Sequence, residues 1–304
     1  MNPTIHGLWP ALLHPVADDG ALDTSRAIAH ARRMLQAGCD GVTLFGTTGE
    51  GPAFSVDERK ALLEAMLGAG IAPEQIIVTT TAVALPDVIA LARHALALGV
   101  VRQMWMPPFY FNQPRDAGVV KAASQMMEGV GDARLRVLLY HFPAMSTYGF
   151  SREAIAELLR RHPGQVVGLK DSSGDLEHAQ GLAQAFAQLS ILVGFEPHIP
   201  LVMQHGGAGS INGLANVAPG LMRRVVDAPH AVSADDTRLM QALLALMQVR
   251  PGLPFLGVYK TILAEQTGDD AWLPMRAPLM ALDPAEAQAV REGYRAIGSL
   301  LGQI

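Results

Sequence analysis

The stretch Val166-Val167-Gly168-Leu169-Lys170 is an apolar run that ends in a lysine. If the run is a β-strand, its period of two places Val166, Gly168 and Lys170 on one face. In a parallel sheet closed into a barrel, that face is the interior. An inward side chain at the carboxyl end of a strand lies where barrel enzymes keep their active sites. We therefore expect a closed barrel with Lys170 among its functional residues.

Seven further apolar or β-branched runs share this character, and alanine- and leucine-rich segments of helical period separate them. Such alternation is typical of βα units on a parallel sheet. Eight units within roughly 220 residues match a (β/α)8 TIM barrel, whereas a doubly wound sheet usually has fewer strands and an early dinucleotide-binding motif. The expected strands are Gly7–Leu13, Gly41–Gly46, Ile76–Ala82, Val101–Pro108, Val137–Pro143, Val166–Ser172, Ile191–Phe195 and Gly209–Leu214.

Helix starts and the end of the strand pattern define the domain organisation. The start signals are a capping box of Ser55 with Glu58, Pro86 in a first turn, and Ser151 and Asp283 as N-caps. After about Asp227 only helical stretches follow, over Ser233–Val249, Phe255–Gln266 and Pro284–Leu301. We predict a barrel over residues 1–230 that holds the active site. We expect residues 231–304 to form a C-terminal three-helix extension packed on the barrel, because no low-complexity linker separates the two.

The composition favours a small-molecule enzyme. Half of the 304 residues are hydrophobic, the net charge is −5, and acidic and basic residues are interspersed, which argues against nucleic acid or an anionic membrane as partner. Charged residues and Pro86 interrupt the long apolar stretch 76–101, so we expect no membrane segment. With one cysteine, Cys39, and no signal-peptide pattern at the N-terminus, we expect a cytoplasmic protein without an intrachain disulfide. The ten histidines are scattered without metal-ligand spacing, so we expect no metal and no cofactor.

Lys170 is the candidate nucleophile. Burial disfavours the charged form of a lysine and favours the free amine, which attacks carbonyl carbons. The alternative is a structural lysine that is paired with a buried carboxylate or reaches the rim of the barrel. The other lysines, Lys60, Lys121 and Lys260, lie in helical segments where a lysine is ordinary.

Tyr140 ends the preceding strand, and neighbouring strands are about 4.8 Å apart, so its side chain and that of Lys170 can meet one small substrate. A phenol in this place can relay protons. The alternative is a tyrosine that only fills the top of the barrel. We expect His141 to point away from Tyr140 and to serve in packing or to support the site from behind.

Two glycine-rich stretches are candidate anion sites. Gly46–Gly51 follows the second strand and offers closely spaced backbone N–H groups with the hydroxyls of Thr47 and Thr48, which suits a carboxylate, although a plain βα turn is the alternative. The second stretch, Gly206–Ser210, enters the last strand near the place where phosphosugar barrels bind phosphate. A phosphosugar aldolase or isomerase therefore stays open.

Four motifs in this order carry a family resemblance: GTTGE at 46–50, PPFYF at 107–111, YHFP at 140–143 and GLKDSSGD at 168–175. Together they resemble the dihydrodipicolinate synthase and N-acetylneuraminate lyase family of class I aldolases, and the resemblance covers nearly the whole chain. It implies that Lys170 forms an imine with pyruvate or another 2-oxo acid. It also implies that Tyr140 is the general acid/base and that Thr47 and Thr48 hold the substrate carboxylate.

The resemblance implies three further features of the site. Tyr110 would complete a proton relay through Thr47, and the matching tyrosine of the family commonly reaches into a neighbouring subunit, so a homo-oligomer, a dimer or a homotetramer built from two tight dimers, is expected. Ile211 would line the pocket behind the imine. Gly194 would belong to the substrate-binding residues. The partners are then a small 2-oxo acid and an aldehyde.

Departures from the family pattern bear on the substrate. Dihydrodipicolinate synthases place an arginine five residues after the catalytic tyrosine, where this chain has Met145; the run Pro143–Ser146 instead resembles the P-A-L-S of sialic acid lyases. Those lyases place acidic residues after strand seven, and here Gly194–Pro197 keeps only Glu196. The usual asparagine after the tyrosine is His141, and the usual threonine of an early T-P pair is His14.

We therefore expect a Schiff-base-forming lyase that cleaves a C–C bond next to a 2-oxo acid or forms one with an aldehyde; 2-keto-3-deoxy sugar acids are candidate substrates. The alternatives within the family are dihydrodipicolinate synthase activity and dehydration of a 2-oxo sugar acid. A non-catalytic barrel that binds a 2-oxo acid is the alternative from another class.

Overall fold

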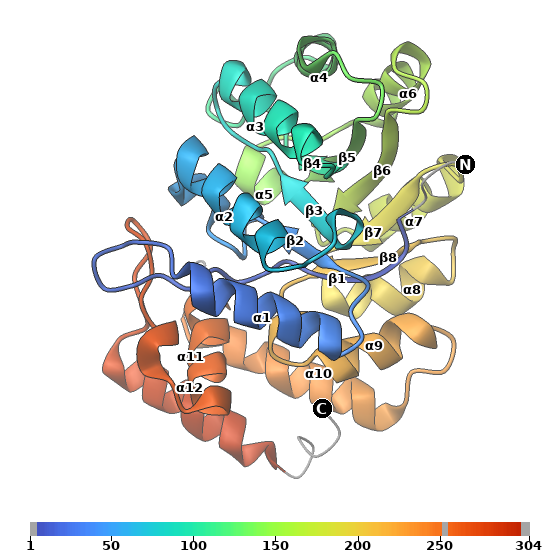
Figure 1. The fold of residues 1–304 in the computed structure, drawn as a ribbon. Coiled ribbons are helices and arrows are strands. Elements are labelled where there is room, and N and C mark those ends of the chain that lie inside the picture. The colour runs from blue at the N-terminus through green and yellow to red at the C-terminus, as the bar shows by residue number, and fades with distance from the viewer. Residues whose placement is uncertain (1–4, 251–254, 299–304) are drawn as a thin grey trace.

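The computed structural model describes residues 5–250 and 255–298 (Figure 1). Eight parallel strands form one sheet in the order β1-β8-β7-β6-β5-β4-β3-β2. A parallel bridge between Ala11 and Thr43 brings the two ends of the sheet together, so the barrel is nearly closed. The strands are β1 Gly7–Pro10, β2 Val42–Leu44, β3 Ile76–Thr79, β4 Arg102–Trp105, β5 Arg136–His141, β6 Val166–Asp171, β7 Ser190–Val193 and β8 Gly209–Asn212.

The predicted TIM barrel and its eight strands are confirmed. All eight predicted runs continue beyond the carboxyl end of the observed strand. The run Gly41–Gly46 is an example: β2 ends at Leu44 because Phe45 takes a φ of +59°, outside the extended region. The apolar composition continues into loops that lie at the carboxyl rim of the barrel, and composition alone does not show where the backbone leaves the sheet.

Helices surround the strands on the outside of the barrel (Figure 1). The capping box of Ser55 with Glu58 precedes α2, Ser151 and Asp283 cap α6 and α12, and Pro86 lies in the first turn of α3, as predicted. The α-helices are α1 Thr24–Gln36, α2 Val56–Gly68, α3 Leu85–Ala97, α4 Asp116–Val130, α5 Pro143–Ser146, α6 Arg152–Arg161, α7 Leu176–Ala185, α8 Ile199–Met203, α9 Pro219–Asp227, α10 Ala234–Ala245, α11 Phe255–Thr267 and α12 Pro284–Ala296. Short 3₁₀ turns include η1 Gly51–Ala53, η3 Glu196–His198, η4 Leu214–Asn216, η5 Leu246–Gln248 and η6 Asp270–Trp272. None of the described helices is long and apolar enough to cross a membrane.

The last three helices follow the barrel, as expected, and α11 with the residues after it contacts α1. Arg26 in α1 is 2.8 Å from the Asp269 carboxylate, and Arg33 donates to the side chain of Gln266 in α11 at 2.7 Å. Figure 1 shows these C-terminal helices, in orange to red, grouped on one side of the molecule. The end of the predicted stretch Pro284–Leu301 lies outside the described residues, and the domain boundary at residue 230 stays a prediction.

The barrel has an inner core and an outer core. The outer cluster lies between strands and helices, whereas the inner cluster fills the barrel and includes Trp9, Ile77, Met104, Leu138, Tyr140, Val167, Leu192 and Ile211. Side chains from nearly all strands thus meet in the interior, which leaves the carboxyl rim as the place for a substrate.

Strand β6 departs from the simple alternation expected for it. Val166 packs in the outer core and Val167 in the inner core, so the prediction that Val166 shares a face with Lys170 was wrong. The register with β5 shifts here: Val137 pairs with Val166, but Leu138 pairs with Gly168. This irregularity inserts one extra residue into β6 before Gly168, and from there on the alternation carries Lys170 inward.

Candidate active site

Lys170 and Tyr140 face each other inside the carboxyl rim of the barrel. They are register partners on β6 and β5, and they are only 3% and 2% exposed. The Lys170 Nζ lies 3.4 Å from the Tyr140 hydroxyl and 4.4 Å from the centre of its ring. Among the described residues no carboxylate forms an ion pair with Lys170, which argues against a purely structural lysine. The amine is thus buried next to one phenol.

Thr47 extends this pair into a chain of three polar groups. Its Oγ1 lies 3.1 Å from the Tyr140 hydroxyl, and either oxygen can be the donor. Because Tyr140 touches both the amine and the threonine hydroxyl, a proton can pass along Lys170, Tyr140 and Thr47. The fold thus brings together three of the four residues expected to be catalytic.

These residues border a cavity of about 550 Å³, a size that suits a small metabolite. Six of the seven residues predicted for the site line it: Thr47, Thr48, Tyr140, Lys170, Gly194 and Ile211. They come from separate strands or from the turns that follow them, which the parallel barrel brings to one rim. Another part of the wall comes from α10, η5 and α11, which follow the barrel in the chain: Leu244, Met247, Gln248, Phe255 and Tyr259.

Tyr110, the seventh predicted residue, lies apart from this group. It belongs to the loop between β4 and α4, its side chain is 74% exposed, and it contacts the ring of Phe111 edge-on at 5.3 Å. It does not line the cavity of its own chain. Within one chain, therefore, the described residues do not form the relay from Thr47 to Tyr110.

A smaller apolar cavity of about 160 Å³ adjoins the first one at Thr47 and Tyr140. Met145, on the short helix α5, lies in its wall. The other lining residues are Phe45, Gly46, Pro52, Thr79, Thr81, Met106 and Phe109. None of these residues carries a charge, so this side of the site offers no cation for an acidic substrate.

Gly194 is needed for steric reasons. A Cβ atom at this position would lie 2.1 Å from the Ser172 Oγ and 3.1 Å from the Lys170 Cε. The Gly194 N–H donates to the Asp171 carbonyl at 2.7 Å, so the backbone cannot easily withdraw. The missing side chain thus makes the space that the Lys170 side chain occupies.

Glu196 contributes a buried carboxyl group to the cavity wall. Its Oε1 accepts the Leu214 N–H at 3.1 Å, and the buried phenol of Tyr259 from α11 lies close to the same group. Burial raises the pKa of Glu196, although hydrogen bonds from backbone N–H groups, that of Leu214 among them, and the charge of Lys170 act in the opposite direction. The site therefore contains a carboxyl group that favours its protonated form more than a carboxyl in water does.

His141 points away from the cavity, as expected. Its Nδ1 accepts the Phe150 N–H at 3.0 Å, and its ring stacks on His178 at 4.3 Å. His178 in turn lies 2.7 Å from the Asp171 carboxylate. Burial lowers the pKa of His141 to about 4, so the ring is neutral near pH 7.

His141, Asp171 and His178 are the only group of three side chains in the described part of the chain whose potential metal-ligand atoms lie within 4.8 Å of one another. In the neutral ring of His141, Nδ1 accepts a backbone proton, so Nε2 carries the ring proton. That tautomer offers no free nitrogen lone pair. As arranged, the three side chains do not fit a metal ion.

The ordinary role expected for Lys260 was wrong. Lys260 and Glu50 form an ion pair in which both side chains are 0% exposed. Lys260 also donates to the Pro274 carbonyl at 2.8 Å. A helical period alone does not reveal a carboxylate that arrives from a distant turn. The available signal was a lysine within an almost wholly apolar helical segment, Val258–Leu263.

Comparisons with known proteins show the family of the chain. The model of the dihydrodipicolinate synthetase family matches residues 4–296. A DapA-like lyase of Chloroflexus aurantiacus that is itself uncharacterized is 35% identical over 297 residues, which cover 96% of this chain and 96% of the relative. The 4-hydroxy-tetrahydrodipicolinate synthase of Rhizobium meliloti is 30% identical over 305 residues, which cover 96% of this chain and 98% of that one.

A solved structure leads to the same result. Dihydrodipicolinate synthase from Agrobacterium tumefaciens superposes with a TM-score of 0.89 at 32% identity, over 96% of this chain and 99% of that one. The match thus spans the barrel, the rim that carries Lys170 and the C-terminal helices. The chain belongs to the dihydrodipicolinate synthetase family.

Proposed function

We propose that the protein is a lyase of the class I aldolase type in which Lys170 forms an imine with pyruvate or another 2-oxo acid. The observation that carries the proposal is the buried Lys170 amine, 3.4 Å from the Tyr140 hydroxyl in a cavity of about 550 Å³. No metal and no cofactor is required for this chemistry.

The reaction follows from the properties of an amine and a phenol in contact. The amine adds to the keto carbon, and loss of water gives the imine while Tyr140 takes up and returns the protons. The protonated imine withdraws electrons from the adjacent carbon. The bond from that adjacent carbon to the hydroxyl-bearing carbon beyond it can then break: the hydroxyl passes its proton to Tyr140 and becomes the carbonyl of the released aldehyde, and the bonding electrons form the enamine. The reverse step condenses the enamine with an aldehyde and returns the proton.

The turn after β2 is the proposed carboxylate site. Thr47 and Thr48 border the cavity beside Lys170 and Tyr140, so their hydroxyls and nearby N–H groups are available to an anion. In this proposal Ile211 and Gly194 shape the apolar side of the 2-oxo acid pocket. Anchoring the carboxylate presents the keto carbon to the amine.

The charges around the site favour an uncharged, hydroxylated aldehyde partner, such as that released from a 2-keto-3-deoxy sugar acid. Among the described residues, Lys170 is the only cation in the walls of the two cavities. A second carboxylate or a phosphate would lack a charged partner, which speaks against dihydrodipicolinate synthase activity and against phosphosugars. The Glu196 carboxyl and the Ser172 hydroxyl instead suit sugar hydroxyls.

The glycine-rich entry to β8 has an explanation that needs no phosphate. A Cβ on Gly209 would lie 2.1 Å from the Gly7 carbonyl oxygen, so the close approach of β1 and β8 requires glycine.

Dehydration of a 2-oxo sugar acid remains the second candidate, because Glu196 provides a carboxyl of raised pKa that can protonate a leaving hydroxyl. Identification of the product, aldehyde or deoxy acid, separates the two reactions.

The imine is tested by incubating the protein with pyruvate and borohydride and mapping the reduced adduct by peptide mass spectrometry. We expect an adduct confined to Lys170, none in Lys170→Ala, and an unchanged adduct in Lys121→Ala, which removes an exposed lysine on α4. If only a larger 2-oxo acid gives the adduct, pyruvate is not the donor. Turnover by Lys170→Ala at the wild-type rate, or no adduct with any 2-oxo acid, would contradict the proposal.

The proposed assembly is a homo-oligomer, a dimer or a tetramer, in which Tyr110 completes the relay of a neighbouring site. Its 74% exposed side chain supports this. Mixing Lys170→Ala chains with Tyr110→Phe chains tests it, because a shared site would pair Lys170 of one chain with Tyr110 of the other. Activity should then reappear in the mixture, and none should appear if every site is built from one chain.

We further propose a cytoplasmic location, which the single buried free thiol of Cys39 supports.

A further inference from the structure

Glu50 shapes the turn that carries Thr47 and Thr48. Its backbone has φ 54° and ψ 26°, a left-handed conformation that is strained for a residue with a side chain. In this conformation the Glu50 N–H donates to the Thr47 carbonyl at 3.0 Å, and the Gly51 N–H donates to the Gly46 carbonyl at 3.1 Å. The turn is therefore closed by the one residue in it that needs outside support to stay in place.

That support comes from the chain after the barrel. One carboxylate oxygen of Glu50 pairs with Lys260 in α11, and the other accepts the Arg276 N–H at 3.0 Å. Lys260 is itself fixed by its bond to the Pro274 carbonyl. Because Glu50 and Lys260 are wholly buried, neither charge can exchange its partner for water. The carboxylate thus ties the turn to α11 and to the segment that follows it.

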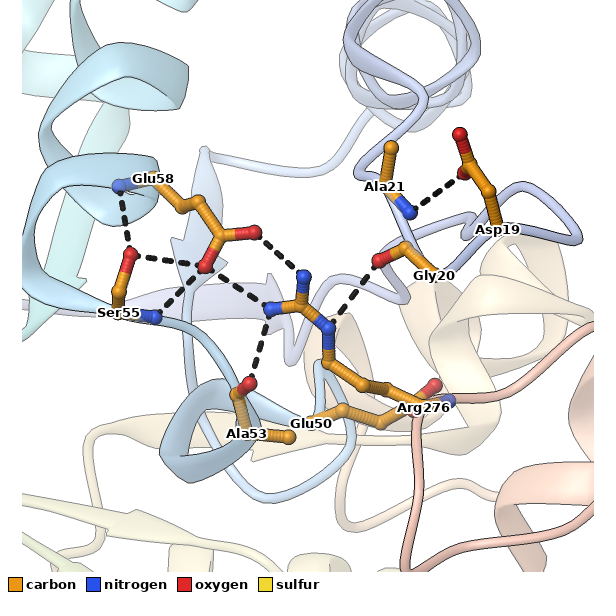
Figure 2. Close-up of polar contacts among 8 residues, drawn as sticks. All are labelled: Asp19, Gly20, Ala21, Glu50, Ala53, Ser55, Glu58 and Arg276. Atoms are coloured by element: carbon orange, nitrogen blue, oxygen red, sulfur yellow. Dashed lines mark hydrogen bonds and ion pairs between the residues drawn. The ribbon is translucent and has the colours of Figure 1, made fainter.

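The Arg276 side chain holds the chain where it leaves this turn, as Figure 2 shows. Its guanidinium bonds to the Glu58 carboxylate at 2.9 Å and donates to the carbonyls of Ala53 at 2.9 Å and Gly20 at 3.1 Å. It also lies over the Phe54 ring, 4.5 Å from its centre. Backbone and side chain of one residue in the C-terminal segment therefore restrain both Glu50 and the following loop.

His14 restrains the remaining side of the turn. The buried ring donates from Nδ1 to the Gly49 carbonyl at 2.6 Å. A Cβ on Gly49 would lie 2.6 Å from this ring, so the turn and the imidazole are in close contact. The Thr47–Glu50 stretch is thus held from the loop after β1 and from the C-terminal segment.

Stability alone does not explain a buried ion pair of this kind. Removing two charges from water offsets most of their attraction, and an apolar pair of similar volume often stabilises a protein as well or better. An apolar pair would lack the directional contacts by which the Glu50 carboxylate is fixed to Lys260 and to the Arg276 N–H. We propose that Glu50 and Lys260 are positioning residues that hold the Thr47–Thr48 turn in the geometry needed to bind the 2-oxo acid carboxylate; this rests on the proposed function.

The double variant Glu50→Gln/Lys260→Met tests the proposal, since it removes both buried charges and leaves none unpaired. Three quantities are measured: the thermal midpoint, the pyruvate concentration that gives half-maximal borohydride adduct, and hydrogen exchange of the amides at residues 46–51. The matched control is Arg224→Met/Asp236→Asn, which removes a 2.7 Å ion pair between α9 and α10. Glu50→Gln alone, which keeps the side-chain volume and an acceptor for the Arg276 N–H, is the second variant should the double variant fail to fold.

We expect the double variant to melt near the wild-type temperature, to need at least about tenfold more pyruvate and to exchange its 46–51 amides faster. The control pair should leave the pyruvate dependence and the exchange of these amides unchanged. Wild-type pyruvate dependence and wild-type exchange in the folded charge-free variant would overturn the positioning role. Failure of the wild-type protein to form any adduct would instead count against the proposed function, and the exchange of the turn amides would then decide the positioning role.

Discussion

The Lys170 amine and the Tyr140 hydroxyl lie 3.4 Å apart because their residues are direct register partners on neighbouring strands. A pairing set by the backbone of two buried strands leaves little freedom in this distance. The extra residue in β6 lies before Gly168, on the amino-terminal side of the pair, so it changes the packing of the barrel without moving the amine off the inner face.

Removal of the Tyr140 hydroxyl should slow turnover while leaving the nucleophile in place. For Tyr140→Phe we expect kcat to fall by about 10²- to 10⁴-fold, the range for loss of a general acid/base. Trapping with borohydride should still label Lys170, only more slowly. The control is Tyr294→Phe, which removes a hydroxyl on α12 that accepts from Gln266. An unchanged kcat in Tyr140→Phe would rule out the proton-transfer role.

A methyl group at position 194 should displace the nucleophile. In Gly194→Ala the added carbon would lie within 3.1 Å of the Lys170 side chain and 2.1 Å from Ser172. We expect kcat/KM to fall by about 10²-fold, because displacement of a catalytic group by about 1 Å has effects of that size. Gly68→Ala, at a position in α2 where nothing lies within 4 Å of the added carbon, should keep full activity. A fully active Gly194→Ala enzyme would show that the amine has more room than the structure gives it.

An arginine at position 145 should alter the choice of aldehyde. Met145 lies in the wall of the apolar cavity that borders Tyr140, and Met145→Arg adds the cation that this wall lacks. One charge-assisted hydrogen bond contributes about 1.5–3 kcal/mol. We therefore expect kcat/KM for an aldehyde that carries a carboxylate to rise roughly 10- to 100-fold relative to a neutral one. Met145→Leu serves as the uncharged control. An unchanged ratio of the two kcat/KM values would show that this wall does not contact the aldehyde partner.

Buried histidines should make the protein sensitive to acid. Burial lowers the pKa of His14 from 6.5 to about 4. As the pH falls from 6.5 to 4, the His14 ring therefore takes up a proton in the unfolded chain before it does so in the folded protein. The stabilisation is complete above pH 6.5, and about 3 kcal/mol of unfolding free energy is lost by pH 4. The pKa values of His30 and His141 are also lowered to about 4, and both residues add to this loss.

His14→Gln keeps a donor for the Gly49 carbonyl and removes the titrating ring. Urea unfolding between pH 4 and pH 7 should show a shallower dependence of the unfolding free energy on pH, by about one proton. His205→Gln, at an exposed position after α8, is the matched control. If the unfolding free energy of the His14→Gln variant depends on pH as steeply as that of the wild type, His14 does not contribute to the acid sensitivity as predicted.

The barrel and the centre of the site were predictable because they depend on local patterns. Alternating apolar runs mark the strands, and a lysine and a tyrosine at the carboxyl ends of adjacent runs must meet if the strands are parallel neighbours. The motifs around Thr47 and Lys170 added the family. The extra residue in β6 was missed because the pattern was read with an unbroken period of two, and Val166 and Val167 are equally apolar.

Contacts between distant segments lay beyond such patterns. Nothing near Lys260 in the sequence indicates that Glu50 is its partner, and nothing near Tyr259 indicates that it reaches the Glu196 carboxyl. Both contacts depend on how α11 packs against the rim of the barrel. The role proposed for Tyr110 likewise rests on a contact between chains, which no pattern near Tyr110 in the sequence describes.

The wall of the large cavity is divided between two stretches of the chain: the barrel supplies the proposed imine site, whereas Leu244, Met247, Gln248 and Phe255 come from the helices after it. In this proposal the imine chemistry lies in the barrel alone, whereas the wall that faces the aldehyde is shared between the barrel and the later helices. Recombination that exchanges only the last quarter of the chain between two relatives would replace part of this wall, provided that the exchanged piece keeps its lysine opposite Glu50. Substrate preference can thus change in part through the C-terminal helices while the catalytic strands stay the same.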